Sequence, residues 1–323
     1  MEYRTLPNTG LKVSRVSFGT MTFGSQTDEG VARRMIDLCL GAGINFIDTA
    51  NIYNRGLSET IVGKVLKGRR DKVVLATKVR GKMGEAPDES GLSRAAIRKA
   101  VDASLQRLQT DYVDLYYLHQ PDYDVPIEET LAAMDELVKA GKVRYPAVSN
   151  YAAWQVAEIH CISQKNGYLP PFISQPMYNL LARAIEDEYL PFCKRYGVAV
   201  VPYNPLAGGL LTGKQSHGNK PIAGSRFDGN TMYLDRYWHE ADFAAVEELK
   251  TVARHAGKKL IELALQWVLS QDQVDSVILG ASGLEQLEEN LKACEGRKLP
   301  NDLLQRCDDV WRHLRGVTPK YNR

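Results

Sequence analysis

Short apolar segments rich in β-branched residues alternate along this chain with longer segments in which apolar residues recur every three or four positions. The short segments predict β-strands, and the longer ones predict amphipathic helices. The predicted strands cover residues 16–19, 44–48, 73–78, 113–119, 143–149, 173–175, 198–203 and 276–280. They begin at similar intervals, except for one long interval before the last strand.

The helical pattern is clearest in residues 28–41, where Val31, Met35, Leu38 and Cys39 fall on one face. Residues 93–109, 127–140 and 284–293 are also expected to be helical. Several strands are apolar throughout, which is typical of a sheet covered by helices. Eight strands alternating with helices favour an α/β fold, specifically a (β/α)8 TIM barrel, and an open doubly wound sheet is the alternative.

Two further segments lie outside this repeat. Residues 3–13, with a turn at residues 8–10, predict an N-terminal β-hairpin outside the barrel. Residues 215–239 are rich in Gly, Pro, Asn and Asp and predict a long loop, a candidate lid over a ligand. We expect one domain over residues 1–323 that ends in a C-terminal helical extension.

Composition narrows the classes of function. Lys and Arg number 41 and Asp and Glu 39, a net charge of +2, which does not indicate a nucleic-acid or membrane partner. No apolar stretch approaches the roughly 18 residues of a membrane span, and the first residues lack a secretory pattern. The 5 cysteines are scattered and form no CxxC pair. We therefore expect a cytoplasmic protein with reduced thiols and no metal site.

Ionisable residues gather at the predicted strand ends, where the active site of a TIM barrel lies. Asp48, Lys78 and His119 end consecutive strands, and Tyr53 lies in the loop beyond Asp48. An ammonium group lowers the pKa of a neighbouring phenol, and a carboxylate keeps that ammonium charged. An imidazole can hold a carbonyl oxygen. This set suits hydride addition to a carbonyl, with a cofactor as the hydride source.

The same segments resemble the motifs of the aldo-keto reductase family, over residues 3–296. In chain order they are residues 45–50 with Tyr53, 75–78, 117–119, 148–150, 173–175, 201–206, and 280–282 with Gln286, Glu289 and Asn290. Each motif alone is weak, but their shared order and spacing are specific. The resemblance implies an NAD(P)(H)-dependent oxidoreductase that interconverts aldehydes or ketones and alcohols.

The resemblance also implies roles for single residues. Tyr53 is expected to be the general acid in reduction and the base in oxidation, tuned by Lys78 and Asp48, and His119 is expected to orient the carbonyl. The residues expected to bind the nicotinamide half and the pyrophosphate are Gly19, Thr20, Met21, Asp48, Ser149, Asn150, Gln175, Tyr203, Asn204, Pro205, Leu206, Gly208 and Lys214. Those expected at the adenosine end are Arg226, Gly280, Ser282, Gln286, Glu289 and Asn290.

No GxGxxG motif follows a strand, so a Rossmann-type cofactor site is not expected. Arg226 and Ser282 suit a 2′-phosphate, with added charge from Lys214, and we therefore expect NADP(H), with NAD(H) as the alternative. Two residues depart from the family pattern. Pro146 stands inside a predicted strand and predicts a local distortion, and Asn204 replaces a common Ser, which makes one phosphate contact uncertain.

Two other functions remain as alternatives. A branch of the same fold family serves as cofactor-binding β subunits of potassium channels, and residues 280–290 resemble it, but His119 is typical of the reductases. A Schiff-base lyase would need an uncharged Lys78, which Asp48 disfavours. The sequence indicates a small carbonyl or alcohol substrate without identifying it, and it leaves the oligomeric state open.

Overall fold

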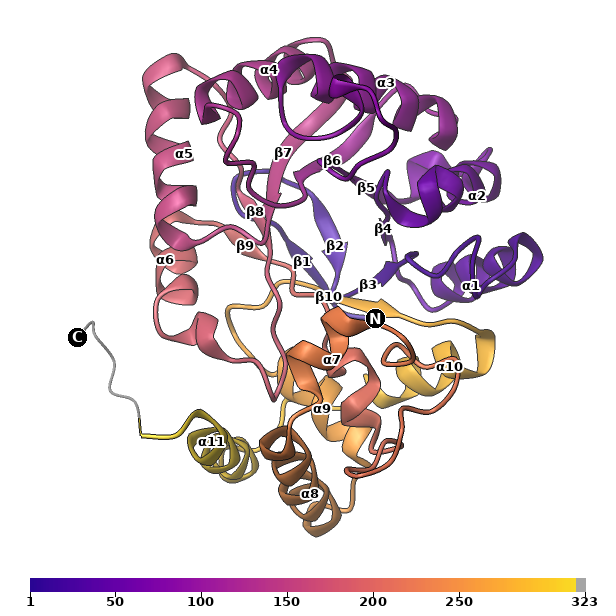
Figure 1. Cartoon of the computed structure of the whole chain (residues 1–323), viewed down its shortest axis with the longest axis vertical. Coiled ribbons are helices and arrows are strands. Elements are labelled where there is room, and N and C mark those ends of the chain that lie inside the picture. Colours follow the sequence, from indigo (N-terminus) through magenta and orange to yellow (C-terminus); the bar gives the residue numbers. More distant parts are fainter. Residues whose placement is uncertain (318–323) are drawn as a thin grey trace.

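The computed structural model describes residues 1–317 and contains a closed ring of eight parallel strands (Figure 1). The strands are β3 (Val16–Gly19), β4 (Phe46–Asp48), β5 (Val74–Val79), β6 (Val113–Leu118), β7 (Val143–Ser149), β8 (Ile173–Gln175), β9 (Ala199–Val200) and β10 (Val277–Gly280). They pair in chain order, and β10 pairs with β3. The amides of Asp275 and Ile278 donate to the carbonyls of Val200 and Pro202 at 2.9 and 3.0 Å. These bonds close the ring, so the TIM barrel is confirmed and the open sheet is excluded.

Helices surround the ring and follow the strands in turn. They are α1 (Glu29–Gly41), α2 (Leu57–Leu66), α3 (Arg94–Leu108), α4 (Ile127–Lys139), α5 (Ala153–Asn166), α6 (Tyr189–Tyr196), α9 (Leu260–Leu269) and α10 (Leu284–Ala293). Short 3-10 helices are η1 (Tyr53–Gly56), η2 (Arg70–Lys72), η3 (Pro87–Glu89), η4 (Ala184–Glu186) and η5 (Ala207–Thr212). The predicted alternation of strands and helices is confirmed, with small differences at the element ends.

The long interval before the last strand contains η5, α7 (Thr231–Tyr237) and α8 (Glu240–His255) in addition to α9. The prediction of a loop through residues 215–239 is therefore wrong for its last part. Asn230 caps α7, because its side-chain oxygen accepts a hydrogen bond from the amide of Tyr233. The C-terminal extension is α11 (Asn301–Arg315), which lies beside α8 (Figure 1).

The predicted N-terminal hairpin is formed by β1 (Tyr3–Thr5) and β2 (Lys12–Ser14), which pair antiparallel. It covers the end of the barrel where the strands begin. Leu6 and Val13 are fully buried and pack with the residues that fill the barrel interior. The Tyr145 hydroxyl at the start of β7 donates to the Thr9 carbonyl. The barrel is therefore sealed at this end and open to ligands at the other.

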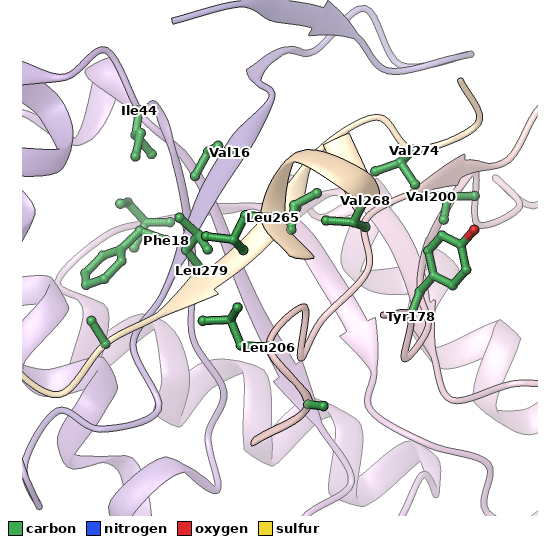
Figure 2. Packing of buried hydrophobic residues seen from close by; sticks show 14 of the residues in the cluster. Val16, Phe18, Ile44, Tyr178, Val200, Leu206, Leu265, Val268, Val274 and Leu279 are labelled. Atoms are coloured by element: carbon green, nitrogen blue, oxygen red, sulfur yellow. The ribbon is translucent and has the colours of Figure 1, made fainter. Parts of the chain in front are cut away.

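A second apolar layer lies between the strands and the helices (Figure 2). Phe18 on β3 and Leu279 on β10 pack in this layer with Leu265 and Val268 on α9, and all are essentially inaccessible to solvent. Full burial of such a side chain contributes about 1.5–3 kcal/mol each. This packing holds β10 and β3 in register beneath the functional site.

Pro146 does not interrupt β7. The strand continues through it, and Pro146 is paired in register with Tyr116 of β6. On the other side, the ladder with β8 includes only Val148 and Ser149. The expected distortion is thus not seen as a break, since the paired positions on β8 lie beyond the proline.

Candidate active site

A cavity of about 600 Å³ opens at the carboxyl ends of the barrel strands. Its walls come from the ends of β3, β4, β7, β8 and β10 and from the segments that follow β5, β6 and β9. This is the end of the barrel opposite the N-terminal hairpin. The predicted clustering of strand-end residues therefore produces one continuous pocket.

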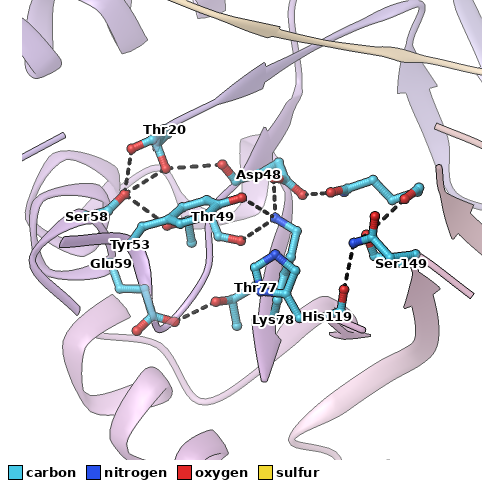
Figure 3. A network of polar contacts seen from close by, with 12 residues as sticks. Thr20, Asp48, Thr49, Tyr53, Ser58, Glu59, Thr77, Lys78, His119 and Ser149 are labelled. Carbon is cyan, nitrogen blue, oxygen red and sulfur yellow. Dashed lines mark hydrogen bonds and ion pairs between the residues drawn. The ribbon is translucent and has the colours of Figure 1, made fainter. Parts of the chain in front are cut away.

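A buried ion pair forms the floor of this pocket (Figure 3). Lys78 Nζ lies 2.5 Å from Asp48 Oδ1 and 2.8 Å from the Thr49 carbonyl oxygen. The two side chains are 0 % and 2 % exposed. Burial acts to lower the pKa of Lys78, but Asp48 and Tyr53 oppose it, and the pKa lies above its usual value. Lys78 is therefore a fixed positive charge at neutral pH.

Tyr53 lies directly above this pair. Its hydroxyl is 3.3 Å from Lys78 Nζ, close enough for a hydrogen bond. Burial raises the pKa of Tyr53, and Lys78 opposes that rise without cancelling it. As expected, the ammonium of Lys78 acts to lower the pKa of Tyr53, but burial raises this pKa by more. The phenol is protonated at neutral pH and has a cation beside it that would stabilise the phenolate.

His119 faces Tyr53 across the pocket. The two rings stand edge to face, with their centroids 6.0 Å apart. Burial and the charges of Lys78 and Arg80 lower the pKa of His119 to about 3. The imidazole is therefore neutral at physiological pH and offers one N–H donor and one acceptor.

The backbone around Tyr53 is held in an unusual conformation. Asn54 and Arg55 have φ of 48° and 54°, in the left-handed region that residues other than glycine seldom adopt. The Asn54 side-chain amide donates to the carbonyl oxygens of Met21 and Phe23 at 3.0 and 2.7 Å. These bonds fix the turn and, with it, the position of the Tyr53 ring.

Behind this turn, the fully buried Glu59 on α2 accepts a hydrogen bond from Thr77, the neighbour of Lys78 on β5. The other carboxylate oxygen of Glu59 pairs with Arg107 on α3 at 2.7 Å. Figure 3 shows how this contact connects α2 to the strand that carries Lys78. Tyr53 and Lys78 are thereby supported by the same buried group.

A chain of amides and hydroxyls forms the facing wall. Gln175 Nε2 donates to Asp48 Oδ2 at 2.9 Å, and the Ser149 hydroxyl donates to the Gln175 carbonyl. Asn150 donates to the His119 carbonyl at 2.9 Å, and its oxygen accepts a hydrogen bond from the Tyr203 hydroxyl at 2.8 Å. The residues expected at the nicotinamide are thus brought together beside Asp48 and His119.

The pocket continues past Tyr203 along η5. Asn204 has φ of 63°, and its side-chain oxygen accepts a hydrogen bond from the Gly208 amide at 2.6 Å. Asn tolerates this backbone region better than most residues, which explains why it stands here. Gly208 also has positive φ, and a Cβ there would lie 2.7 Å from the Tyr233 ring. At Gly208, the backbone of this turn therefore lines the cavity with no side chain over it.

The far end lies at the start of α10. The Ser282 amide and hydroxyl both reach Gln286 Oε1, at 2.8 and 3.0 Å. Arg226 donates to the Tyr233 hydroxyl at 2.9 Å and lies against Gly280. Lys214 is mostly exposed, and its Nζ is 4.0 Å from Glu289. A phosphate at this end would meet Arg226, Ser282 and a helix N-terminus.

Most of the expected residues line this one cavity. They are Gly19, Met21, Asp48, Tyr53, His119, Ser149, Asn150, Gln175, Tyr203, Asn204, Pro205, Leu206, Gly208, Lys214, Arg226, Gly280, Ser282 and Gln286. Lys78 lies beneath the surface of the pocket. Thr20 is buried and hydrogen-bonded to Ser58, and Asn290 is buried with its amide on the Gly280 carbonyl. Thr20 and Asn290 therefore stand behind the wall, whereas Glu289 is partly exposed and does not line the cavity.

Several lining residues were not predicted. They include Thr22, Gln26, Ile52, Arg80, Gly81, Thr212, Ile222, Met232, Tyr233 and Arg236. Arg80 follows a predicted strand end by two positions, so the same strand-end rule was a usable signal for it. Met232, Tyr233 and Arg236 lie on α7, which the sequence pattern did not reveal.

The charge of the pocket suits an anionic dinucleotide. Among the described lining residues, the segment after β9 contributes the cations Lys214, Arg226 and Arg236, and Arg80 is a separate cation near His119, whereas Asp48 alone is acidic. Asp48 is already neutralised by Lys78. A phosphate-bearing cofactor therefore finds positive charge and exposed backbone along an extended cavity. The residues present fit a nicotinamide dinucleotide.

Within residues 1–317, no group of three or more His, Cys, Asp or Glu side chains could hold a metal ion. No helix in this described part of the chain has the length and apolar character needed to cross a bilayer.

The fold and the site together define an α/β-barrel protein with a buried Asp–Lys pair under a tyrosine. The model of the aldo/keto reductase family matches residues 15–312. The chain is 38% identical to the "Uncharacterized oxidoreductase YrpG" of Bacillus subtilis (strain 168), covering 99% of each chain. It is 38% identical to human "Aldo-keto reductase family 7 member A3", over 94% of this chain and 96% of that protein.

A further relative is the "Probable voltage-gated potassium channel subunit beta" of Oryza sativa subsp. japonica, 38% identical over 91% of this chain and 92% of that protein. The chain belongs to the aldo/keto reductase family. It is an oxidoreductase of a family that uses nicotinamide cofactors and acts on small molecules.

Proposed function

We propose that this protein is an NADP(H)-preferring aldehyde or ketone reductase, which also runs in the oxidative direction, with Tyr53 as its proton donor and acceptor. The observation that carries the proposal is the position of the Tyr53 hydroxyl, 3.3 Å from the ammonium of a lysine paired with a buried carboxylate. Few other reactions need a phenol, a fixed cation and a neutral imidazole around one small volume.

A nicotinamide cofactor, when bound, would supply the hydride that reaches the carbonyl carbon, and the protein's own groups provide and hold the proton. Tyr53 donates its proton to the carbonyl oxygen, and the adjacent Lys78 stabilises the phenolate that remains. His119, which is neutral, donates a hydrogen bond to the same oxygen and fixes its direction. In oxidation the phenolate accepts the proton again.

The preference for NADP(H) rests on charge at the far end of the pocket. Arg226 is half-buried and donates a hydrogen bond to the Tyr233 hydroxyl, and it has no acidic partner among the described residues. A guanidinium in that state favours a doubly charged 2′-phosphate over a ribose hydroxyl. For the rest of the cofactor, we propose the contacts that the sequence predicts, with separate groups of residues at the nicotinamide, the pyrophosphate and the adenosine. We further propose that the protein acts in the cytoplasm as one domain.

A role as a potassium channel β subunit is the second candidate, since two relatives, from Oryza sativa subsp. japonica and Arabidopsis thaliana, are named "Probable voltage-gated potassium channel subunit beta". The intact set of Tyr53, Lys78, Asp48 and His119 favours turnover, because a sensor that only binds cofactor does not need a complete proton-transfer site.

The test is a titration of the purified protein with NADPH and with NADH, followed by tryptophan fluorescence. Loss of absorbance at 340 nm is then measured after adding a panel of aldehydes. The proposal expects tighter binding of NADPH and turnover with at least one aldehyde. Binding without turnover in either direction would support the second candidate, and no binding of either cofactor would refute both.

A further inference from the structure

Arg80 is a charged residue in the pocket that the proposed mechanism does not use. It follows the end of β5, two positions after Lys78, and lines the same cavity as Tyr53 and His119. Its charge is close enough to contribute to the lowered pKa of His119. The guanidinium therefore lies at the reacting end of the pocket, away from the groups around Ser282.

The guanidinium has no acidic partner among the described residues. Its Nε is inaccessible to solvent and has no hydrogen-bond acceptor, and no carboxylate of residues 1–317 forms an ion pair with it. Two other arginines with little exposure, both away from the cavity, do have such partners. Arg107 pairs through its Nε with Glu59, and Arg183 pairs with Glu186 and Asp308. A buried polar group without a partner is costly, so its retention at a ligand site points to a ligand that satisfies it.

The backbone holds Arg80 firmly. Its φ is 122°, a region that side chains with a Cβ rarely occupy. The Arg80 carbonyl accepts a hydrogen bond from Gly91 at 3.0 Å. The next residue is Gly81, where a Cβ would lie 2.5 Å from Ile52. The backbone that carries the Arg80 side chain is thus held by a hydrogen bond at Arg80 and by close packing at Gly81.

The chemistry of the missing partner follows from its location. Asp48 is committed to Lys78 and Gln175. The groups suited to cofactor phosphates lie at the far end, around Gly208 and Arg226. An anion that reaches Arg80 must therefore arrive with the molecule that carries the carbonyl. A planar guanidinium matches a carboxylate with two parallel hydrogen bonds.

We propose that Arg80 is a specificity-determining residue that binds the carboxylate of an aldehyde or ketone substrate. This inference rests on the proposed reductase function and names the substrate class for it. Its preferred substrates are short carbonyl compounds with a carboxylate near the reacting carbon, rather than neutral aldehydes of the same shape.

The experiment compares each carboxylated aldehyde with its methyl ester, which has nearly the same shape and no charge. The pairs are glyoxylate and methyl glyoxylate, and 4-carboxybenzaldehyde and methyl 4-formylbenzoate. For the wild type we expect kcat/KM to favour the acid of at least one pair by on the order of tenfold or more, as expected for a hydrogen bond to a charged group. Arg80→Leu should abolish that preference, chiefly through KM, and leave ester reduction within about twofold.

Arg80→Lys is the matched variant, because it keeps the charge without the planar fork and should retain part of the preference. NADPH binding, followed by fluorescence, checks that both variants are folded and should match the wild type. Equal kcat/KM for acid and ester in the wild type, or equal losses for both in Arg80→Leu, would overturn the inference. Those outcomes leave the reductase function standing, whereas failure to reduce any aldehyde, ester or acid, would count against that function itself.

Discussion

The two ends of the ligand cavity are built differently. At the reacting end, Asp48, Lys78 and Gln175 are buried and hold one another by hydrogen bonds of 2.5–2.9 Å. At the far end, Lys214 is 68 % exposed and Arg226 contacts a tyrosine on a short helix. The first set comes from barrel strands, and the second from the segment between β9 and β10.

This difference separates two tasks. Proton transfer requires groups held in place before the substrate arrives, because reorganisation during the reaction would raise the barrier. Cofactor binding tolerates side chains that settle around the ligand, since ordering them costs affinity and not rate of the chemical step. Substitutions of the proton-transfer groups Asp48, Tyr53 and Lys78 should therefore change kcat, and those at the far end should change cofactor affinity.

The largest effect is expected for Tyr53→Phe. Removing the phenol leaves no positioned proton donor, so kcat for carbonyl reduction should fall by about 10²–10⁴-fold or more. NADPH affinity should stay nearly unchanged, because the phenol acts on the substrate. Single-turnover kinetics and fluorescence titration measure the two quantities. A variant that kept more than a small fraction of its activity would show that another group donates the proton.

Lys78→Met should reduce both activity and stability. The stabilising charge beside Tyr53 is lost, and the Asp48 carboxylate, 2 % exposed, is left without its cation at a cost of about 3–5 kcal/mol. Denaturant unfolding of Lys78→Met and of the double variant Asp48→Asn/Lys78→Met tests this. The double variant should be the more stable of the two while remaining inactive. If the single variant were as stable as the wild type, the pair would not be a coupled buried unit.

Arg226→Gln should act on the cofactor alone. Losing one charge-assisted hydrogen bond to a phosphate raises the Kd for NADPH by roughly 10–100-fold, since such a bond contributes about 1.5–3 kcal/mol. The Kd for NADH should change little, and so should kcat at saturating cofactor. Equal weakening of both cofactors would assign Arg226 to the shared pyrophosphate instead of the 2′-phosphate.

The smallest expected effect is on the pH profile. The pKa of His119 is lowered to about 3 from an ordinary 6.5, so the imidazole stays neutral as the pH falls through 6.5. The pKa of Tyr53 is raised above its usual 10, so the proton donor stays protonated up to that region. The value of kcat/KM for reduction should be flat between about pH 6 and pH 9. A step near pH 6.5 that disappears in His119→Gln would contradict the neutral assignment.

The strands and the reacting end could be predicted from the sequence because both depend on local pattern. Apolar runs mark the strands, and the residue types at their ends give Asp48, Lys78, His119 and Gln175. Closure of the barrel could be predicted from two features alone, the number of strands and their alternation with helices. The sequence pattern does not show which way a side chain points. Thr20 and Asn290 lie close to lining residues, but their side chains are buried and do not line the cavity.

The rest depended on tertiary structure. Arg80 enters the pocket through a backbone with φ of 122°, which no local preference of arginine predicts. The helix α7 is short, and its sequence is surrounded by loop-forming residues, so its periodicity is too brief to detect. The net pKa of Tyr53 depends on burial, which pairwise reasoning about Lys78 leaves out.

The N-terminal hairpin has a consequence for the route by which ligands reach the cavity. Because Leu6 and Val13 close the strand-start end of a barrel whose interior is filled by side chains, the ligand cavity is closed off from that side. Reactants and products therefore enter and leave at the end of the barrel where the strands finish. A tag attached ahead of Met1 would lie at the strand-start end of the barrel, away from the cavity. The enzyme could therefore be tethered to a surface through such a tag without blocking the cavity.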